Sequence, residues 1–495
     1  MTYEVVVVGG GMGGLTVAAL LAARGVSVCL LERESRPGGC LASFEKFGYT
    51  FDSSVGLYTG WQPGEIHDRV FSQLSVEPPE VSRLDPALVV RLPDETSVLI
   101  TSVVEEFEES LLAAFPECAG RAIEFYRESA RMSEVLRRAA RRVPDLATAS
   151  NLKRAFALLP DFLAAARVFK QRGRTTLASL EGTSLRFRRF IDAQLQLLTQ
   201  TSSAECSCLC ASVALNALRD GVFTIRGGAP ALAEKLAASI KASGGRIRLD
   251  TPVLRLAYDS AGQAVGVDLL SGETVRASRA IISNLTVWDT YGKLIGLHRT
   301  PLEVRKRLTN LASWGVYLLY VGLDEAAAAR IPNDRILALT DWQEQNYDPE
   351  SSQLMFAAPP ANDPRAPHGK RAATILTFSD VDQWFTYHEN EEQHEQKDQA
   401  MIEAWWPRIH QAIPELGDGL ELIETATPRT FYDLTRRKLG MVGASKEPTR
   451  TFFGSSFGSS TSLPNVFMVG DTTLPAAGVA GVTKAALMLA DKLTM

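Results

Sequence analysis

A glycine-rich segment near the start of the chain, VVVVGGGMGGLTVAALLAARGVSVCLLER at residues 5–33, constrains the fold more than any other part of the sequence. Val5–Val8 is a run of β-branched residues, which is typical of a strand buried on both faces of a parallel sheet. The alanine- and leucine-rich stretch that follows predicts a helix from about Gly13 to Arg24, and Ser27–Leu31 predicts a second strand. Strand, helix and strand in this order form the βαβ unit of doubly wound α/β folds.

The spacing of the glycines indicates a dinucleotide-binding site. Gly9, Gly11 and Gly14 have the G-x-G-x-x-G spacing directly after the first strand. In this motif the first glycine permits a tight turn, the second lets a pyrophosphate approach the backbone, and the third lets helix and strand pack closely. The amides of the first helical turn, near Gly13, point toward that phosphate. Glu32, at the end of the second strand, is placed to accept hydrogen bonds from a ribose.

The end of the chain, NVFMVGDTTLPAAGVAGVTKAALMLADKL, repeats the pattern of a short strand followed by a helix. Val466–Val469 predicts a strand that ends at Gly470 and Asp471. A helix is expected to begin near Gly478 or Val479. The acid at the strand end places a carboxylate at the ligand-binding edge of the sheet, and the positive end of the helix dipole points into the same crevice.

The central stretch at 227–284 adds further strands to this unit. It predicts a helix over Ala231–Ala242 and four strands, near residues 246–249, 253–258, 264–270 and 280–282. Two more strand patterns, at 311–323 and 372–379, are expected to form a second sheet that covers the ligand.

Charge and apolar patterning limit the class of partner and the cellular location. The net charge of -5 argues against general binding of nucleic acid. No basic region precedes the first apolar run, so no signal peptide is expected. Residues 12–31 are apolar, but Arg24 and Gly25 interrupt them, so a membrane span is not expected either. A cytoplasmic location is the prediction, with peripheral contact at the cytoplasmic membrane face considered below.

The sequence shows no recognisable metal-binding or catalytic side-chain motif. Cys206, Cys208 and Cys210 form a C-x-C-x-C run, which is not a standard zinc spacing, so no metal is expected. No Ser-His-Asp arrangement or pair of catalytic carboxylates is recognisable, and none of the six histidines has a motif around it. The catalytic residues therefore stay unassigned, and a bound cofactor is expected to carry the chemistry.

These stretches together resemble the flavin-dependent amine-oxidase and phytoene-desaturase superfamily. The matching pieces are the glycine motif and the segments ERESRPGG at 32–39, RGGAPALAEKL at 226–236, GGRIRLDTPV at 244–253 and VGDTTLPAAGVAGV at 469–482. The resemblance implies FAD rather than NAD, held in a Rossmann-type α/β domain of the glutathione-reductase kind.

The resemblance also implies roles for individual residues. Glu32 and Arg33 begin a motif whose acid binds the adenosine ribose, and the glycines that end it, Gly38 and Gly39, pass close to the pyrophosphate. Val253 matches a position whose backbone contacts adenine. Asp471 matches an acid that bonds the pyrophosphate or ribitol region of the flavin.

Within this superfamily the chain resembles the branch of carotenoid desaturases, carotenoid isomerases and retinol saturases. FGYTFDSSVGLYTG at 47–60 and TATPRTF at 425–431 carry this likeness. Ser54, Val55 and Gly56 stand where the branch often has Gly, Pro and Ser. The resemblance implies a hydrophobic isoprenoid polyene as substrate, with desaturation, saturation and cis–trans isomerisation all left open. A flavin amine oxidase, or a prenyl-binding carrier similar to the Rab GDP-dissociation inhibitors, is the alternative.

The expected organisation is a discontinuous FAD-binding domain, a substrate-binding domain with a mixed sheet, and a helical subdomain. Their ranges are 1–70 with 221–290 and 440–495, then 71–110 with 291–439, and finally 111–220. Residues 121–174 of the helical part carry 13 Lys and Arg against 5 Asp and Glu. This excess is typical of a solvated helix face, or alternatively of a peripheral contact with an anionic membrane surface.

Overall fold

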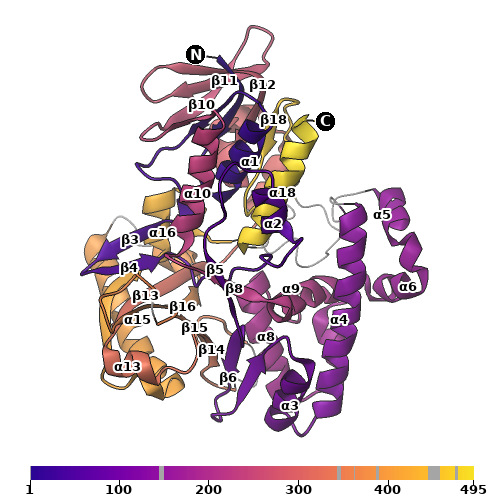
Figure 1. The fold of residues 1–495 in the computed structure, drawn as a ribbon, viewed down its shortest axis with the longest axis vertical. Helices are drawn as coiled ribbons and strands as arrows, with labels where there is room; N and C mark the ends of the chain where they lie inside the picture. Colours follow the sequence, from indigo (N-terminus) through magenta and orange to yellow (C-terminus); the bar gives the residue numbers. More distant parts are fainter. Residues whose placement is uncertain are drawn as a thin grey trace.

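The fold is built on two large sheets and a group of helices at one side (Figure 1). The computed structural model describes residues 2–143, 146, 150–342, 347–361, 363–385, 390–443, 457–473 and 478–494. The first sheet lies at the end of the molecule that holds both termini. The second sheet lies at the opposite end, with the helical group beside it.

The first sheet has a parallel core in the order β9–β2–β1–β12–β18, and the antiparallel pair β10–β11 extends it beside the N-terminal half of β12. Its strands are β1 (Thr2–Val8), β2 (Val28–Leu31), β9 (Arg246–Arg248), β10 (Val253–Tyr258), β11 (Ala264–Leu269), β12 (Thr274–Ser283) and β18 (Val466–Met468). The valine run thus forms a central strand, as its β-branched composition predicts. β12 is much longer than the strand expected at 280–282, because its first half pairs with β11.

Three helices cover one face of this sheet: α1 (Met12–Ala23), α10 (Ala229–Ala242) and α18 (Gly478–Thr494). They bury the side chains of Val5, Val7 and Leu30 from the strands. The side chains of Val6, Val8 and Leu31 point to the other face. There they pack with residues of β10, β11 and the short helices that follow β12. Burial on both faces fixes the strand register, since a shift by one residue would exchange the two sets. The carboxyl ends of β1, β2, β12 and β18 therefore meet at one edge.

The second sheet is mixed, in the order β17–β13–β16–β15–β14–β6–β7. Its strands are β6 (Leu88–Arg91), β7 (Ser97–Ile100), β13 (Gly315–Leu323), β14 (Arg335–Leu339), β15 (Gln353–Ala357), β16 (Arg371–Ser379) and β17 (Leu420–Ala426). One face packs against the helical group, and the other packs against α13 (Glu325–Arg330) and α15 (Glu391–Ala412).

The helical group comprises α3 (Val104–Ala114), α4 (Ala119–Arg142), α5 (Asn151–Leu158), α6 (Phe162–Gln171), α7 (Thr176–Ser179), α8 (Leu185–Thr199) and α9 (Cys208–Asp220). No strand interrupts it over its described residues, in line with the helical subdomain expected at 111–220. α5 and α6 stand beyond α4 at the outer edge of the molecule (Figure 1). Among the helices of the described chain, none combines the length and the apolar composition that a membrane crossing requires.

Two short ribbons, β3 (Ser43–Lys46) with β4 (Tyr49–Asp52) and β5 (Val81–Leu84) with β8 (Val222–Ile225), lie between the sheets. The remaining α-helices of the described residues are α2 (Ile66–Phe71), α11 (Val287–Asp289), α12 (Leu302–Asn310), α14 (Asp382–Phe385) and α16 (Pro428–Thr435). α2 packs against α18, so the segment that follows β4 reaches the edge where the parallel strands end.

Candidate cofactor site

The glycine-rich turn between β1 and α1 has the geometry that the motif predicts. Gly9 has a φ of 98°, a backbone conformation that side-chain-bearing residues rarely adopt. A Cβ at Gly14 would lie 2.1 Å from the carbonyl oxygen of Gly9, so any larger residue there would push helix and turn apart. The N-cap of α1 is Gly11, and no side chain caps the first turn. The first amides of α1 are therefore left for a ligand.

Glu32 is held against this turn. Its Oε2 accepts a hydrogen bond from the amide of Gly10 at 2.5 Å, and its Oε1 accepts one from the amide of Glu34 at 2.9 Å. The carboxylate is thus oriented before any ligand binds, and its remaining lone pairs can accept ribose hydroxyls. The carbonyl of Glu32 also accepts a hydrogen bond from the amide of Thr251. This bond holds the residues just before Val253 beside the acid.

The second pair of glycines lies directly on the first. The amide of Gly38 donates to the carbonyl of Gly10 at 2.9 Å, and Gly38 forms a β-bridge with Gly11. A Cβ at Gly39 would lie 3.1 Å from the Cα of Gly11. Two glycine turns from separate motifs therefore present bare backbone to the same space, which suits the close approach of a pyrophosphate. The side chain of Arg33 takes a different course, donating to Glu34 Oε1 at 2.7 Å and to the carbonyl of Leu434 at 2.6 Å.

Asn284, which the sequence analysis did not single out, lies behind the glycine-rich turn. It follows β12, and its side-chain amide donates to the carbonyl of Val469 at 2.7 Å. A Cβ at Gly11 would lie 2.6 Å from its Oδ1 and one at Gly13 would lie 2.8 Å from its Nδ2. The lack of a side chain at these positions is therefore already required by the protein itself. A polar residue directly after an apolar strand was the signal that could have found it.

The C-terminal motif reaches the same edge. Gly470, with a φ of 156°, lies two residues after the end of β18, and Asp471 follows it. Its carboxylate forms an ion pair with Arg437 at 3.0 Å, a partner that the sequence analysis missed. α18 begins at Gly478 and Val479, as expected, whereas the preceding residues 474–477 of the motif lie outside the described part of the chain. Most of the residues named for the site thus meet at one sheet edge, whereas the side chain of Arg33 turns away from it. The uncapped amides, bare glycines and oriented acid at this edge fit a flavin dinucleotide.

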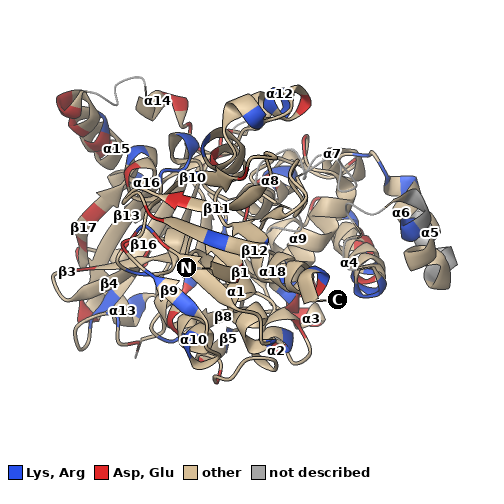
Figure 2. Ribbon diagram, turned by 90° about the horizontal axis from the view of Figure 1, so that it is seen from above, with Lys and Arg blue, Asp and Glu red and all other residues tan. Residues whose placement is uncertain are grey.

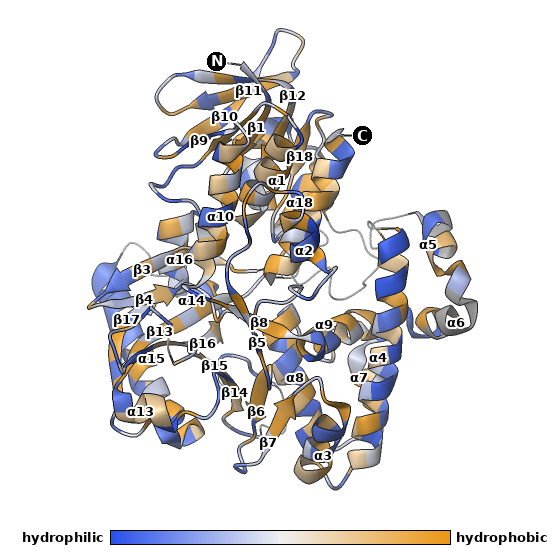
Figure 3. Ribbon diagram, viewed as in Figure 1, coloured by the Kyte–Doolittle hydropathy of each residue, from blue (hydrophilic) through white to orange (hydrophobic). Residues whose placement is uncertain are grey.

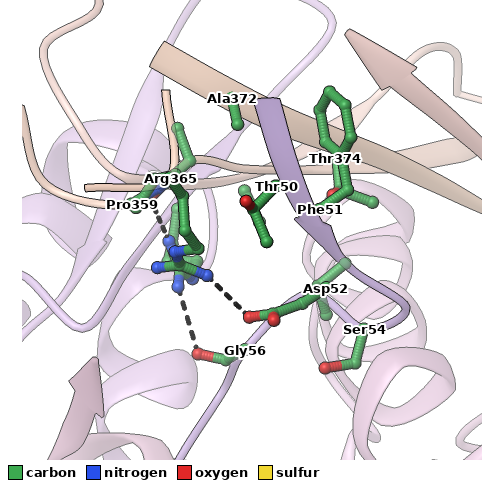
Figure 4. Close-up of a pocket in the computed structure, with 13 residues that line it drawn as sticks. Thr50, Phe51, Asp52, Ser54, Gly56, Pro359, Arg365, Ala372 and Thr374 are labelled. Atoms are coloured by element: carbon green, nitrogen blue, oxygen red, sulfur yellow. Dashed lines mark hydrogen bonds and ion pairs between the residues drawn. The ribbon is translucent and has the colours of Figure 1, made fainter. Parts of the chain in front are cut away.

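A buried charge cluster joins this region to the second sheet (Figure 4). Arg365 pairs with Asp52, at the end of β4, at 2.6 Å and with Asp363 at 2.7 Å. Arg335, on β14, donates to the carbonyl of Gly56 at 3.2 Å. The cavity that these side chains line measures about 20 Å³, which is room for about one water molecule. The cluster therefore fixes the 52–56 segment, and its cavity is too small to be a substrate pocket.

Burial governs the titration of this cluster. It raises the pKa of Asp52, a shift that the neighbouring Arg365 opposes. It lowers the pKa of Arg335 to about 10, although the nearby Asp334 favours the charged form.

The other side chains with possible chemistry are cysteines and histidines outside the two glycine turns. Cys206 and Cys208 are buried at the start of α9, where the thiol of Cys208 bonds the carbonyl of Thr175 at 3.0 Å. Across the described residues, no group of three or more His, Cys, Asp or Glu side chains could hold a metal ion. His67 is buried on α2, where burial lowers its pKa to about 3. His388 lies outside the described residues.

Known proteins are similar to this chain over nearly its whole length. The sequence profile of the family described as "Flavin containing amine oxidoreductase" matches residues 12–493. The prolycopene isomerase of Daucus carota is 25% identical, with 99% of this chain and 80% of the relative covered. The all-trans-retinol 13,14-reductase of Danio rerio is 24% identical over 98% of this chain and 84% of the relative. A neurosporene-forming phytoene desaturase of Cereibacter sphaeroides is 25% identical over 98% and 93%.

Solved structures share the fold. An oxidoreductase from Methanosarcina mazei has a TM-score of 0.66 at 16% identity, covering 99% of this chain and all of that one. Putrescine oxidase bound to putrescine has a TM-score of 0.64 at 14% identity, covering 100% and 98%.

Proposed function

The chain belongs to the family of flavin-containing amine oxidoreductases, and from this premise we propose that its substrate is an uncharged isoprenoid polyene, such as a carotenoid. The family confirms the expected flavin, FAD, and makes the chain a flavin oxidoreductase. Its curated relatives include carotenoid and retinoid enzymes. The proposal concerns the substrate and the change made to its double bonds.

The pairing of the carboxylates at the cofactor edge carries this proposal. Glu32 accepts two backbone amides, Asp471 is paired with Arg437, and Asp52 is paired with Arg365. A protonated amine would need a free carboxylate or an aromatic cage as counterpart. Asp471 and Asp52 are already paired with arginines, and Glu32 lies at the ribose position of the cofactor. An uncharged substrate needs no such counterpart and so fits this edge better than a cationic amine.

The similarity to relatives adds the kind of reaction. The relatives are named as an isomerase, a 13,14-reductase and a desaturase, and each aligns with nearly the whole of this chain. All three names describe a change at double bonds. We therefore propose desaturation, saturation or cis–trans isomerisation of the polyene, and a flavin amine oxidase as the second candidate because of the fold shared with putrescine oxidase.

The residues of the site would bind and orient the cofactor. When bound, FAD would supply the redox chemistry for the double-bond system of the substrate. The amides at the start of α1 would hold the pyrophosphate, and Glu32 would hold the ribose. α18 begins at the same edge, and the positive end of its dipole would favour negative charge on the cofactor. Because a polyene delocalises the charge that develops on it, the reaction makes little demand for a strong protein base.

Product analysis under two redox conditions tests the proposal. The holoenzyme is mixed without oxygen with a poly-cis carotene, once with oxidised and once with photoreduced FAD. Desaturation of the carotene with oxidised FAD only would support a polyene substrate and identify the enzyme as a desaturase. Double-bond saturation or geometric change with photoreduced FAD only would also support a polyene substrate, and would identify a saturase or an isomerase. Turnover of a primary or secondary amine, with no change in any polyene, would overturn the polyene and favour the second candidate.

We also propose that α5 and α6 contact an anionic membrane surface. The α4 arginines behind the sequence prediction are largely paired: Arg137 with Glu134 and Asp220, and Arg141 with Glu65. Figure 2 shows acidic and basic residues together on α4, whereas α6, at the outer edge, carries basic ones. The charge excess of 121–174 therefore divides into a paired part on α4 and an outer part on α5 and α6.

Exposed apolar side chains accompany the outer part. Phe156 is 69% exposed, Leu159 65% and Phe169 53%, and Figure 3 shows hydrophobic positions on α6. Within the described part of the chain, Lys170 and Arg172 beside them form no ion pair. Exposed aromatic residues beside cations that have no ion-pair partner among the described residues suit the interface of an anionic bilayer, from which an insoluble polyene would have to enter.

Vesicle binding tests this contact. Wild-type protein is expected to co-sediment with phosphatidylglycerol vesicles, and less so at high salt. Replacing Lys153, Lys170 and Arg172 by Gln should weaken binding by roughly a hundredfold at low salt, since each basic residue contributes about 1 kcal/mol. Phe156→Ser with Phe169→Ser should also weaken it, whereas Leu302→Ser, at an equally exposed leucine on α12, should not. Equal binding by all variants would contradict the proposal.

A further inference from the structure

Arg437 connects three segments that are far apart in the sequence. It follows α16, and its Nη1 lies 3.0 Å from Oδ2 of Asp471 and 3.7 Å from the sulfur of Cys40. Its Nε donates to the carbonyl of Met441 at 2.6 Å, and its Nη2 donates to the carbonyl of Gly443 at 3.3 Å. The guanidinium thus ties its own loop to the second glycine turn and to the end of β18.

Asp471 is the partner that balances the charge of Arg437. Arg437 is only 8% exposed, and over the described ranges Asp471 is the one carboxylate within ion-pair distance of it. The carbonyls of Met441 and Gly443 are neutral acceptors. Burial raises the pKa of the Cys40 thiol, so this sulfur is uncharged near neutral pH. Burial alone would lower the pKa of Arg437, but the carboxylate of Asp471 outweighs it and raises the pKa above its usual value.

The position of this ion pair relates it to the cofactor. Cys40 comes directly after Gly39, which faces Gly11 across the space between the two glycine turns. Asp471 lies three residues after Met468, the last residue of β18, whose carboxyl end lies at the same edge. The side chain of Asp471 is 28% exposed and that of Arg437 is 9% exposed, so the acid faces the opening and the guanidinium lies behind it.

We propose that Arg437 is a flavin-positioning residue that acts through Asp471. It fixes the orientation of the carboxylate and cancels its charge, so that a cofactor carrying two phosphates can bind beside an acid. Without the guanidinium, the carboxylate would repel the pyrophosphate and would be free to rotate away from the cofactor. The proposal depends on the flavin site and not on the identity of the substrate.

A double-mutant cycle on FAD binding tests the proposal. The dissociation constant of FAD is measured by quenching of flavin fluorescence for Arg437→Met, Asp471→Asn and the double variant. Arg437→Met alone should weaken FAD binding by about tenfold to a hundredfold, because a partly buried carboxylate loses its partner. In the Asp471→Asn background, the same change should weaken it by less than about threefold, because no charge is left to cancel.

Further variants separate this role from simple support of the loop. Arg437→Lys keeps the charge and loses the planar fork, so it should restore much of the affinity. Arg436→Met is the matched control, since the neighbouring Arg436 is exposed and pairs only with Asp433 among the described residues; it should leave FAD binding unchanged. If Arg437→Met does not fold, Arg437→Gln, which also removes the charge but keeps a polar side chain, is compared in the two backgrounds instead. If the change at Arg437 weakened FAD binding equally in the wild-type and Asp471→Asn backgrounds, its effect would not depend on the charge at position 471. That result would overturn the proposal.

Discussion

His67 makes the stability of the apoprotein depend on pH in a way that the structure allows to be calculated. Its ring is 1% exposed on α2 and stacks on Trp61, with 4.2 Å between the ring centroids. Burial lowers its pKa from 6.5 to about 3, while a bond to the backbone of Thr59 opposes the shift slightly. The folded protein therefore keeps this histidine neutral at pH values where the unfolded chain protonates it.

The sign and the magnitude follow from proton linkage. Because the folded-state pKa is the lower one, the contribution of His67 to stability is fully present above pH 6.5 and is lost as the pH falls toward 3. Between pH 7 and pH 5 this single group should lower the free energy of unfolding by about 2 kcal/mol. His67→Phe keeps a flat aromatic ring beside Trp61 and has no proton to gain, so it should lack this part of the acid destabilisation.

Urea unfolding of the apoprotein, followed by circular dichroism at pH 7 and pH 5, measures the effect. The wild type should lose about 2 kcal/mol more than His67→Phe between the two pH values. His368→Phe, at an exposed histidine, serves as the control and should behave as the wild type does. If His67→Phe and the wild type lost the same free energy, the buried neutral histidine would not be the source, and the reasoning would be refuted.

Three further predictions concern the cofactor site. FAD should be bound noncovalently, because the segment at 469–482 contains no His or Cys, and acid precipitation should release it into the supernatant, where its absorbance is measured. Gly14→Ala should weaken FAD binding at least about tenfold, since the new Cβ would meet the carbonyl of Gly9, while Gly120→Ala, with open space around it, should not; flavin fluorescence distinguishes them. Asn284→Ala should lower the free energy of unfolding by about 1–3 kcal/mol, because the buried carbonyl of Val469 loses its donor, and a melting temperature equal to that of the wild type would contradict this.

Local patterns explain why much of the cofactor edge could be anticipated. The valine run of β1, the glycine turn and Glu32 lie within one βαβ unit, where spacing along the chain fixes spacing in the structure. The strand β18 and the acid after it follow the same logic. The length of β12 could not be anticipated, because its first half is a strand only through pairing with β11 and with the start of β1.

Charge counting along the sequence was less informative, because ion pairs join distant segments. The sequence shows the basic excess of 121–174 only as a sum over the whole segment. In the structure, Arg141 is paired with Glu65 and Arg137 with Asp220, two acids outside that segment. Which arginines remain free for a partner therefore depends on packing.

The sequence by itself determined the dinucleotide-binding unit, since periodicity, glycine spacing and an acid at a strand end are local physical signals. Only the tertiary structure decided which groups support that unit. Arg437 reaches Cys40 over 397 positions, and Arg365 reaches Asp52 over 313. Such contacts leave no period or spacing in the sequence, because an ion pair needs only two opposite charges brought together by folding. The charge at the flavin site is for this reason a property of the folded chain.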